Sequence, residues 1–89
     1  MQVKFENKAR KEFLKLDREI QIQILRYIEK IKALEDPRDM GKFLARDLKD
    51  YWRYRVGNYR LICKIKDDEL LIIIIHIGHR NKIYKFFKG

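Results

Sequence analysis

The chain has 89 residues, of which 39% are charged and 46% are hydrophobic. This length predicts one domain over residues 1–89 without room for a second core, and the apolar content excludes a disordered chain. The single cysteine, Cys63, excludes an intramolecular disulfide and a cysteine-rich metal cluster. The apolar run from Leu70 to Ile77 is too short to cross a bilayer, and the N-terminus lacks the apolar stretch of a signal peptide. We therefore expect a protein of the reducing cytoplasm.

The net charge of +9 is unevenly divided along the chain. Residues 1–40 contain 10 Lys and Arg against 8 Asp and Glu, whereas residues 41–89 contain 12 against 5. The excess is therefore +2 in the first part and +7 in the second. Scattered lysines indicate only a solvated surface, but a concentrated positive charge is typical of proteins that bind a polyanion such as the phosphate backbone of RNA.

The first half of the chain predicts a strand followed by two helices. Polar and apolar residues alternate from Gln2 to Phe5, which is typical of a short strand, and Asn7 is placed to cap the next helix. Two apolar stripes at helical spacing predict an αα-hairpin with its joint near Asp17. The stripes consist of Ala9, Phe13 and Leu16, and then of Ile20, Ile24, Tyr27, Ile28, Ile31 and Leu34. Pro37 ends the second helix, because a proline disfavours helical geometry in the preceding residue.

The second half predicts a three-stranded antiparallel meander. Residues 40–50 are basic, contain the breaker Gly41 and are interpreted as a loop. Three strands rich in aromatic and β-branched residues follow, separated by the turn pairs Gly57-Asn58 and Asp67-Asp68: Tyr51 to Val56, Tyr59 to Lys66, and Glu69 to Ile77. The apolar run in the third predicts an interior strand, flanked by the first strand of the chain. Residues 82–89 predict either a short helix or a tail. The fold class is therefore α+β, with the helices packed on one small sheet.

The two-residue turn Gly57-Asn58 fixes the register of the first hairpin. Arg55 then lies opposite Arg60 and Arg53 opposite Ile62, so that the three arginines share one face of the sheet. The other face carries an aromatic and aliphatic layer that predicts core packing: Trp52, Tyr54, Val56, Tyr59, Leu61 and Cys63. A two-residue turn in the second hairpin places Arg60 opposite Ile75. Arg80, which follows the bend at Gly78, would then join the three arginines.

Two arginines that face each other across a hairpin repel and need compensation. One interpretation is a structural ion pair with Asp47, Asp50 or a helix carboxylate. The other is a bound anion, because two guanidinium forks suit a phosphodiester, and Arg80 favours this second interpretation. The arginine face also carries apolar residues, so we expect a partner segment with apolar and acidic residues to cover part of it. These apolar residues are Ile62, Leu71, Ile73 and Ile75.

Two segments combine these aromatic and basic residues. One is Asp50-Tyr-Trp-Arg-Tyr-Arg-Val-Gly-Asn-Tyr-Arg-Leu-Ile62, and the other is Ile77-Gly-His-Arg-Asn-Lys-Ile-Tyr84. Together with the order of strand, helical hairpin and meander, they resemble the RelE family of bacterial and archaeal toxins from toxin–antitoxin pairs. The resemblance extends across the chain. It implies a ribosome-dependent endoribonuclease that cuts messenger RNA in the decoding site, inhibits translation and is silenced by a cognate antitoxin.

The resemblance also implies roles for individual residues. The catalytic positions are Arg55, Arg60, Arg80 and Tyr84, and the phosphate-binding positions are Arg53, Arg55, Arg60 and Lys82. The implied reaction is attack of the RNA 2′-hydroxyl on the adjacent phosphorus, which needs no metal or cofactor. Tyr84 would orient or deprotonate that hydroxyl, since neighbouring cations favour the phenolate. The arginines would stabilise the charge that grows on the phosphorane.

The identity of the general acid stays open between two residues. The resemblance implies Arg80, but arginine hardly ever releases its proton. His79 lies beside it, and histidine is the residue type that most often acts as a general acid, which makes it the alternative, whereas His76 is expected to be an ordinary sheet residue. The best-known family pattern has lysines where this chain has Arg53 and Arg55. Arginine preserves phosphate binding at these positions but cannot act as a base.

Two other functions fit the sequence. The related ParE group shares the fold and an antitoxin partner but inhibits DNA gyrase without nuclease chemistry, and its members generally lack the full set of arginines and tyrosine. A non-catalytic nucleic-acid-binding module is suggested by charge alone, and its binding would fall with salt without any codon-dependent cut. Primer extension on translated messages separates the three functions.

Overall fold

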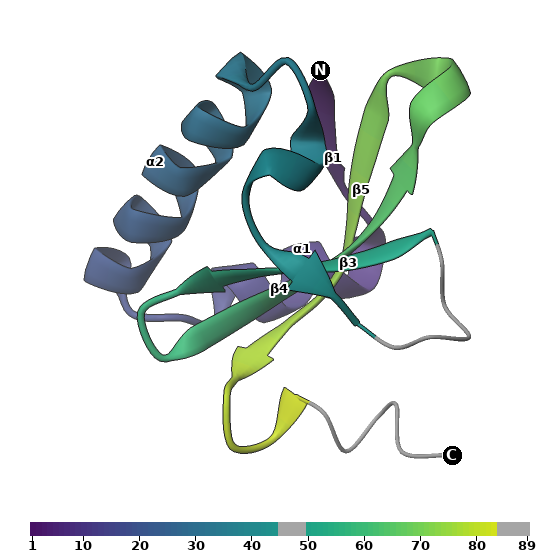
Figure 1. Ribbon diagram of the computed structural model, residues 1–89. Coiled ribbons are helices and arrows are strands. Elements are labelled where there is room, and N and C mark those ends of the chain that lie inside the picture. The colour runs from purple at the N-terminus through teal and green to yellow at the C-terminus, as the bar shows by residue number, and fades with distance from the viewer. Residues whose placement is uncertain (45–49, 84–89) are drawn as a thin grey trace.

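The computed structural model describes residues 1–44 and 50–83 of the chain. It confirms the predicted α+β class, with two helices packed on one sheet (Figure 1). The elements in chain order are β1 (Gln2–Phe5), α1 (Asn7–Leu14), α2 (Arg18–Ala33), the 3-10 turn η1 (Pro37–Asp39), β2 (Lys42–Phe43), β3 (Tyr51–Val56), β4 (Tyr59–Lys66), the 3-10 turn η2 (Asp67–Glu69) and β5 (Leu71–His79). None of the described helices combines the length and apolar character needed to span a membrane.

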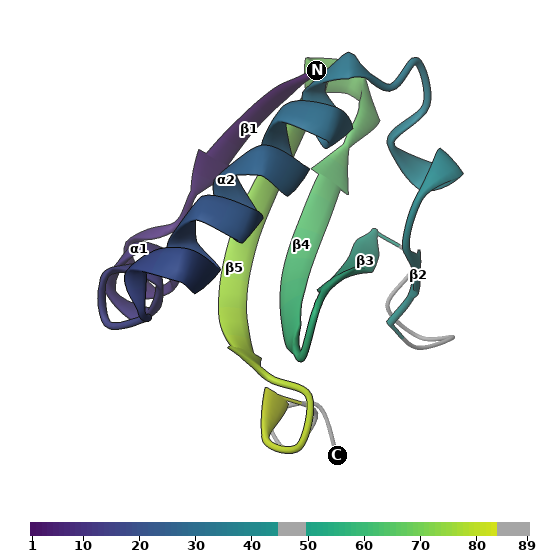
Figure 2. The same ribbon diagram turned by 90° about the vertical axis from the view of Figure 1, so that its left-hand side faces the viewer.

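The sheet contains five strands in the order β1-β5-β4-β3-β2. The strands β3, β4 and β5 form the predicted antiparallel meander, and β1 runs parallel to β5. The apolar strand β5 therefore has a neighbour on each side, and one of them is the first strand of the chain, as predicted. Because β1 ends at Phe5, no strand from the described residues pairs with the last part of β5 on that side, and α1 lies alongside it instead (Figure 2).

Glu12 fastens α1 to this uncovered part of β5. Its carboxylate lies 2.7 Å from Nδ1 of His76 and accepts a 3.1 Å hydrogen bond from the amide of Ile77. His76 is buried in the sheet, as expected. A side-chain carboxylate thus replaces a neighbouring strand as the partner of a β5 amide that burial would otherwise leave unsatisfied.

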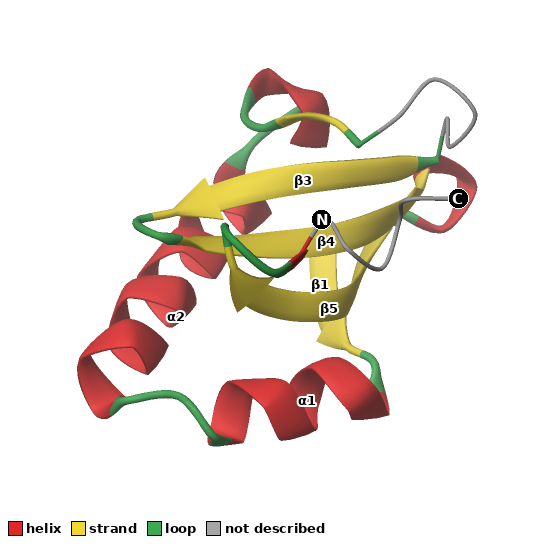
Figure 3. Cartoon of the chain, turned by 90° about the horizontal axis from the view of Figure 1, so that it is seen from below, coloured by secondary structure: helices red, strands yellow, loops and turns green. Residues whose placement is uncertain are grey.

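Both helices lie on the same side of the sheet, and the main core fills the space between them and the strands (Figure 3). The stripe of α2 contributes the buried residues Ile24, Ile28 and Ile31. The sheet residues of this core are Trp52, Tyr54, Val56, Leu61, Cys63, Ile65, Ile72, Ile74 and Ile77. The aromatic and aliphatic layer predicted from the hairpin register is therefore core, except that Tyr59 is only half-buried.

Two local predictions were wrong. Asn7 is the first residue of α1 rather than its cap, because Glu6 occupies the N-cap position without a side-chain hydrogen bond. The segment expected to be a loop contains the short edge strand β2, in which Lys42 pairs with Arg53 of β3. Residues 45–49 of that segment lie outside the described residues.

The connection between β4 and β5 also differs from the prediction. Lys66 pairs with Leu71, so that four residues connect the strands instead of two. A β-bulge then places Ile62 opposite His76 and leaves Ile75 as the extra residue. Arg60 consequently lies opposite Gly78, not opposite Ile75. The strand itself runs from Leu71 to His79, two residues later at each end than the predicted strand from Glu69 to Ile77.

Candidate functional site

The β3–β4 hairpin has the register predicted from its turn. Gly57 adopts a φ of 58°, as the first position of a type II′ turn requires, and glycine does so without strain. Arg55 pairs with Arg60, and Arg53 pairs with Ile62. Since side chains alternate along a strand, the three arginines leave the hairpin on the opposite face from the buried Tyr54.

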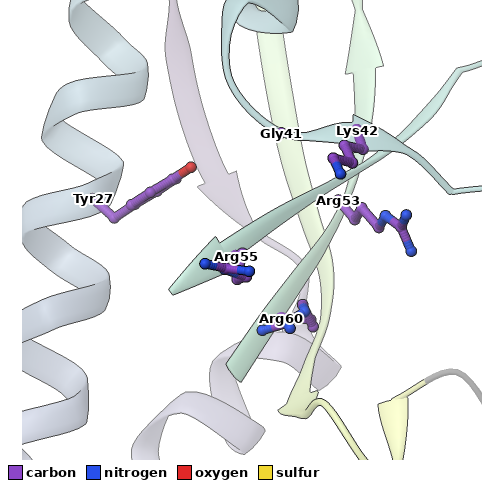
Figure 4. Close-up of a pocket in the computed structure, with 6 residues that line it drawn as sticks. All are labelled: Tyr27, Gly41, Lys42, Arg53, Arg55 and Arg60. Carbon is purple, nitrogen blue, oxygen red and sulfur yellow. The ribbon is translucent and has the colours of Figure 1, made fainter. Parts of the chain in front are cut away.

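The three arginines line a cleft of about 400 Å³ beside β3 (Figure 4). Tyr27 from α2, Gly41 and Lys42 complete its lining. Among the described residues, the lining thus has four cationic side chains and no carboxylate. Like charges gathered in a concave site produce a positive potential that attracts anions. The cleft is therefore suited to a phosphate group.

The guanidinium groups of the facing pair are held differently. Arg60 donates to the carbonyl oxygens of Gly57 and Tyr59, at 3.1 and 3.0 Å. Arg55 is exposed and makes neither a hydrogen bond nor an ion pair with any residue in the ranges 1–44 and 50–83. Asp50 and the helix carboxylates therefore do not neutralise the pair, while Asp47 lies outside the described residues. An exposed cation with no carboxylate partner in these ranges remains available to an external anion.

Two aromatic residues of the core hold the segment that leads into β2. The Tyr54 hydroxyl donates to the Pro37 carbonyl, and Nε1 of Trp52 donates to the Met40 carbonyl, each at 2.6 Å. Gly41 follows with a φ of 81°, and a Cβ atom there would lie 2.4 Å from the carbonyl oxygen of Arg53. A glycine at this position therefore allows β2 to approach β3 and brings Lys42 to the cleft.

The sequence pattern did not reveal Tyr27 as a cleft residue. It belongs to the apolar stripe of α2, and its ring meets that of Tyr54 at a centroid distance of 5.8 Å. It is nevertheless half-buried, and its hydroxyl points away from α2 into the cleft (Figure 4). Helical periodicity identifies the apolar face of a helix but not which residue stands at its border. Gly41 and Lys42 were missed because they were assigned to a loop.

Comparison with known proteins assigns this chain to a family. The sequence matches, over residues 3–84, the family described as ParE toxin of type II toxin-antitoxin system, parDE. The chain belongs to the RelE/ParE superfamily of type II toxins. It is 32% identical over 83 residues to a RelE-like toxin protein of Escherichia coli, and the alignment covers 91% of this chain and 84% of the relative. It is 31% identical to toxin RelG of Mycobacterium tuberculosis, over 93% of this chain and 94% of the relative.

Solved structures of related toxins have the same fold. The toxin–antitoxin complex RelBE of M. tuberculosis matches with a TM-score of 0.76 and 29% identity, over 89% of this chain and 90% of that one. The isolated E. coli RelE toxin matches with a TM-score of 0.72 and 19% identity, over 97% of this chain and 93% of that one. The predicted RelE-like architecture is confirmed, with five strands in the sheet.

The other predicted site residues of the toxin lie near the hairpin turn or beyond the described residues. The Arg80 amide donates a 2.8 Å bond to the Asn58 carbonyl, which brings the chain after β5 to the β3–β4 turn. The Arg80 side chain is exposed but does not line the cleft, so three of the four arginines meet there. The His79 ring meets Tyr59 edge-on at 5.6 Å, and its Nδ1 accepts from the Asn81 amide. Lys82 is exposed, and Tyr84 lies outside the described residues.

A second hollow, of about 570 Å³, combines lysines with apolar groups. It is lined by Glu6, Lys8, Tyr51, Lys64, Lys66, Ile73, Ile75 and His76. Ile73 and Ile75 are half-buried there, whereas Ile62, which was expected to share an open face with them, is fully buried. Exposed apolar side chains bordered by cations can accept a segment that has both apolar and acidic residues.

Proposed function

We propose that this toxin is a ribosome-dependent endoribonuclease that cuts messenger RNA in the decoding site and thereby inhibits translation in the cytoplasm. The observation that carries the proposal is the cleft that Arg53, Arg55, Arg60 and Lys42 line together. Such a site binds the phosphodiester before the reaction and stabilises the added negative charge as it forms. The similarity to RelE-like toxins supports this assignment.

In the proposed reaction, the 2′-hydroxyl of the RNA attacks the adjacent phosphorus and loses its proton. The bond to the 5′-oxygen breaks, that oxygen takes up a proton, and the products are a cyclic phosphate and a 5′-hydroxyl. Arg55 and Arg60 bind the phosphoryl oxygens, because guanidinium groups offer paired donors. Arg53 and Lys82 hold flanking phosphates. All these tasks are performed by side chains, so no metal or cofactor is required.

The proton transfers belong to residues near the end of β5. We assign Tyr84 to orienting or deprotonating the 2′-hydroxyl and Arg80 to stabilising the leaving 5′-oxygen. His79 is the alternative general acid, because imidazole readily transfers a proton whereas guanidinium hardly ever releases one. Its Nδ1 already accepts a hydrogen bond from the Asn81 amide. Nε2 is therefore the atom that would carry the proton.

A cognate antitoxin is the proposed protein partner. The M. tuberculosis and E. coli relatives form toxin–antitoxin complexes. In this chain, the hollow that contains Ile73 and Ile75 between Lys64 and Lys66 suits an antitoxin segment with apolar and acidic side chains. This surface replaces the predicted one, because Ile62 is buried and unable to contribute.

Inhibition of DNA gyrase is the second function to test, since the matched family is described as ParE toxin. The cationic cleft argues for RNA cleavage. Induction of the toxin in cells, followed by primer extension on translated messages and a supercoiling assay with gyrase, separates the two functions. Codon-positioned cuts with normal supercoiling support the nuclease, whereas lost supercoiling without cuts would replace it by gyrase inhibition.

Single-turnover cleavage on saturated, programmed ribosomes tests the residue assignments. Arg80→Ala should slow cleavage by about two orders of magnitude, as loss of transition-state electrostatic stabilisation commonly does. Tyr84→Phe should slow the chemical step similarly and leave ribosome affinity nearly unchanged, because only one hydroxyl is removed. Asn81→Ala provides a neighbouring control. Near-native cleavage rates for both variants would show that His79 or a ribosomal group carries out the proton transfers.

A further inference from the structure

The hydroxyl of Tyr27 is a polar group that the packing of the helix does not explain. The ring stands at the border of the core, where it meets Tyr54 at a centroid distance of 5.8 Å and an interplanar angle of 60°. A phenylalanine would make the same ring contact. The hydroxyl instead extends into the cationic cleft, on the side where Arg55 lies (Figure 4).

The two neighbouring tyrosines differ in how their hydroxyl groups are used. The Tyr54 hydroxyl donates to the Pro37 carbonyl at 2.6 Å. The Tyr27 hydroxyl makes no hydrogen bond with any residue in the ranges 1–44 and 50–83. The Tyr27 side chain is half-buried, and no buried side-chain oxygen among the described residues lacks a hydrogen-bond partner, so this hydroxyl reaches the solvent of the cleft. It is therefore open to an acceptor supplied from outside the fold.

The chemistry of the cleft restricts what that acceptor is. Arg55 offers only donors, so the Tyr27 O–H cannot donate to it. A phosphodiester has non-bridging oxygens that accept from a guanidinium and from a phenol at the same time. Burial raises the pKa of Tyr27, and the nearby Arg55 opposes this only in part. Tyr27 therefore stays protonated at neutral pH and acts as a donor rather than as a base.

We propose that Tyr27 is an RNA-contacting residue of this toxin, whose hydroxyl donates a hydrogen bond to a non-bridging oxygen of the phosphodiester that Arg55 holds. The inference rests on the proposed nuclease function and adds α2 to the surface that positions the RNA. The phosphate oxygen is anionic before the reaction and gains charge as the phosphorane forms, and the Arg55 guanidinium chiefly stabilises that added charge. The neutral phenol donor contributes mainly to binding, so its loss should weaken binding and change the chemical step little.

Tyr27→Phe removes the hydroxyl and keeps the ring on Tyr54. In single-turnover cleavage on programmed ribosomes, the toxin concentration giving half-maximal rate should rise about tenfold, as expected for one hydrogen bond to a charged group. The maximal rate should stay within about twofold. Gln2→Ala, an exposed neutral residue of β1 at the sheet edge opposite β2, is the control and should change neither value. Thermal unfolding of each variant checks that the fold is intact.

A second measurement identifies the acceptor. Messenger RNAs that each carry one neutral methylphosphonate near the cut should bind the wild-type toxin more weakly, and most weakly when the substitution replaces the phosphate held by Arg55 and Tyr27. At that position, the substitution should reduce the RNA affinity of Tyr27→Phe much less than that of wild type, because the hydroxyl is already missing. Should Tyr27→Phe fail to fold, 3-fluorotyrosine at position 27 keeps the ring and makes the phenol a stronger donor. At mildly acidic pH it should then bind more tightly than wild type.

The outcomes distinguish this inference from the function on which it rests. A wild-type toxin that cuts no message on ribosomes would overturn the proposed function. A wild-type toxin that cuts, combined with unchanged half-maximal concentration in Tyr27→Phe or equal methylphosphonate losses in both proteins, would overturn only the role of Tyr27. Weaker antitoxin binding with unchanged RNA affinity would assign the hydroxyl to a protein contact and likewise reject the inference.

Discussion

Arg55 and Arg60 occupy directly opposed positions on β3 and β4, so two cationic side chains leave the sheet from one cross-strand pair. Like charges in such a pair destabilise a hairpin by roughly 0.2–1 kcal/mol. The positive charge of Arg60 is partly compensated, because its guanidinium donates to two carbonyl oxygens at the hairpin tip. The Arg55 side chain is exposed to solvent instead. The hairpin thus carries a repulsion that a bound phosphate would relieve.

Arg55→Gln should therefore change stability and RNA binding in opposite directions. We expect the free energy of unfolding, measured with urea, to rise by about 0.5 kcal/mol as the repulsion disappears. Affinity for single-stranded RNA should fall, and the slope of log K against log salt should decrease by about 0.7 for the lost phosphate contact. Arg60→Gln should weaken binding without the gain in stability, since it also loses the bonds to Gly57 and Tyr59. Equal stability changes in the two variants would contradict this account.

Gly41→Ala should displace the wall of the cleft. The new Cβ would lie 2.4 Å from the Arg53 carbonyl oxygen, on a backbone with a φ of 81°. We expect a loss of about 3 kcal/mol in the free energy of unfolding, from backbone strain together with overpacking. Gly57→Ala is the control, because its φ is also positive but the nearest atom is 3.6 Å away. It should cost only about 1 kcal/mol. Similar losses in the two variants would show that no clash occurs at Gly41.

Glu12→Ala should destabilise the junction between α1 and β5. Removal of the carboxylate leaves the buried Ile77 amide without its acceptor and removes the partner of His76 Nδ1. The expected cost is about 2 kcal/mol, measured by urea unfolding. Glu29→Ala breaks an exposed pair with Lys32 on α2 and should cost under about 0.5 kcal/mol. If both variants lost equally little free energy of unfolding, the Glu12 carboxylate would contribute no more to stability than an exposed surface charge.

The Asp67–Arg38 pair should contribute a small pH-dependent stabilisation. Its two hydrogen bonds, of 2.7 and 3.0 Å, hold the pKa of Asp67 below its ordinary value. A carboxylate with a lowered pKa in the folded state stabilises the protein at neutral pH. That contribution disappears as the pH falls through this pKa, below about 3.9. Because Asp67 is exposed, Asp67→Asn should cost less than about 1 kcal/mol at neutral pH, and nothing in strong acid.

Urea unfolding of wild type, Asp67→Asn and Asp68→Asn at neutral and strongly acidic pH tests this prediction. Asp68 is the control, as an adjacent exposed carboxylate without an ion pair among the described residues. A difference between wild type and Asp67→Asn that persisted in strong acid would show that the carboxylate's charge is not responsible.

The position of the three cleft arginines followed from the sequence because it depends on local geometry. A two-residue turn at Gly57-Asn58 joins the strands with one register, so the pairing of Arg55 with Arg60 is fixed within six residues of chain. The stripe of α2 was likewise readable, since helical periodicity is local. The same argument failed in the next hairpin, where a four-residue connection and a bulge moved Arg60 from Ile75 to Gly78.

The sequence by itself therefore determined the α+β class, the order of the elements and the face on which Arg53, Arg55 and Arg60 stand. Only the tertiary structure decided that these arginines share a cleft with Tyr27, Gly41 and Lys42. Those residues come from a helix border and a short edge strand, which are distant in the chain. They meet through contacts such as Tyr54 with Pro37 and Trp52 with Met40. Such contacts depend on how α2 and β2 pack against β3, and periodicity within one element carries no information about that packing.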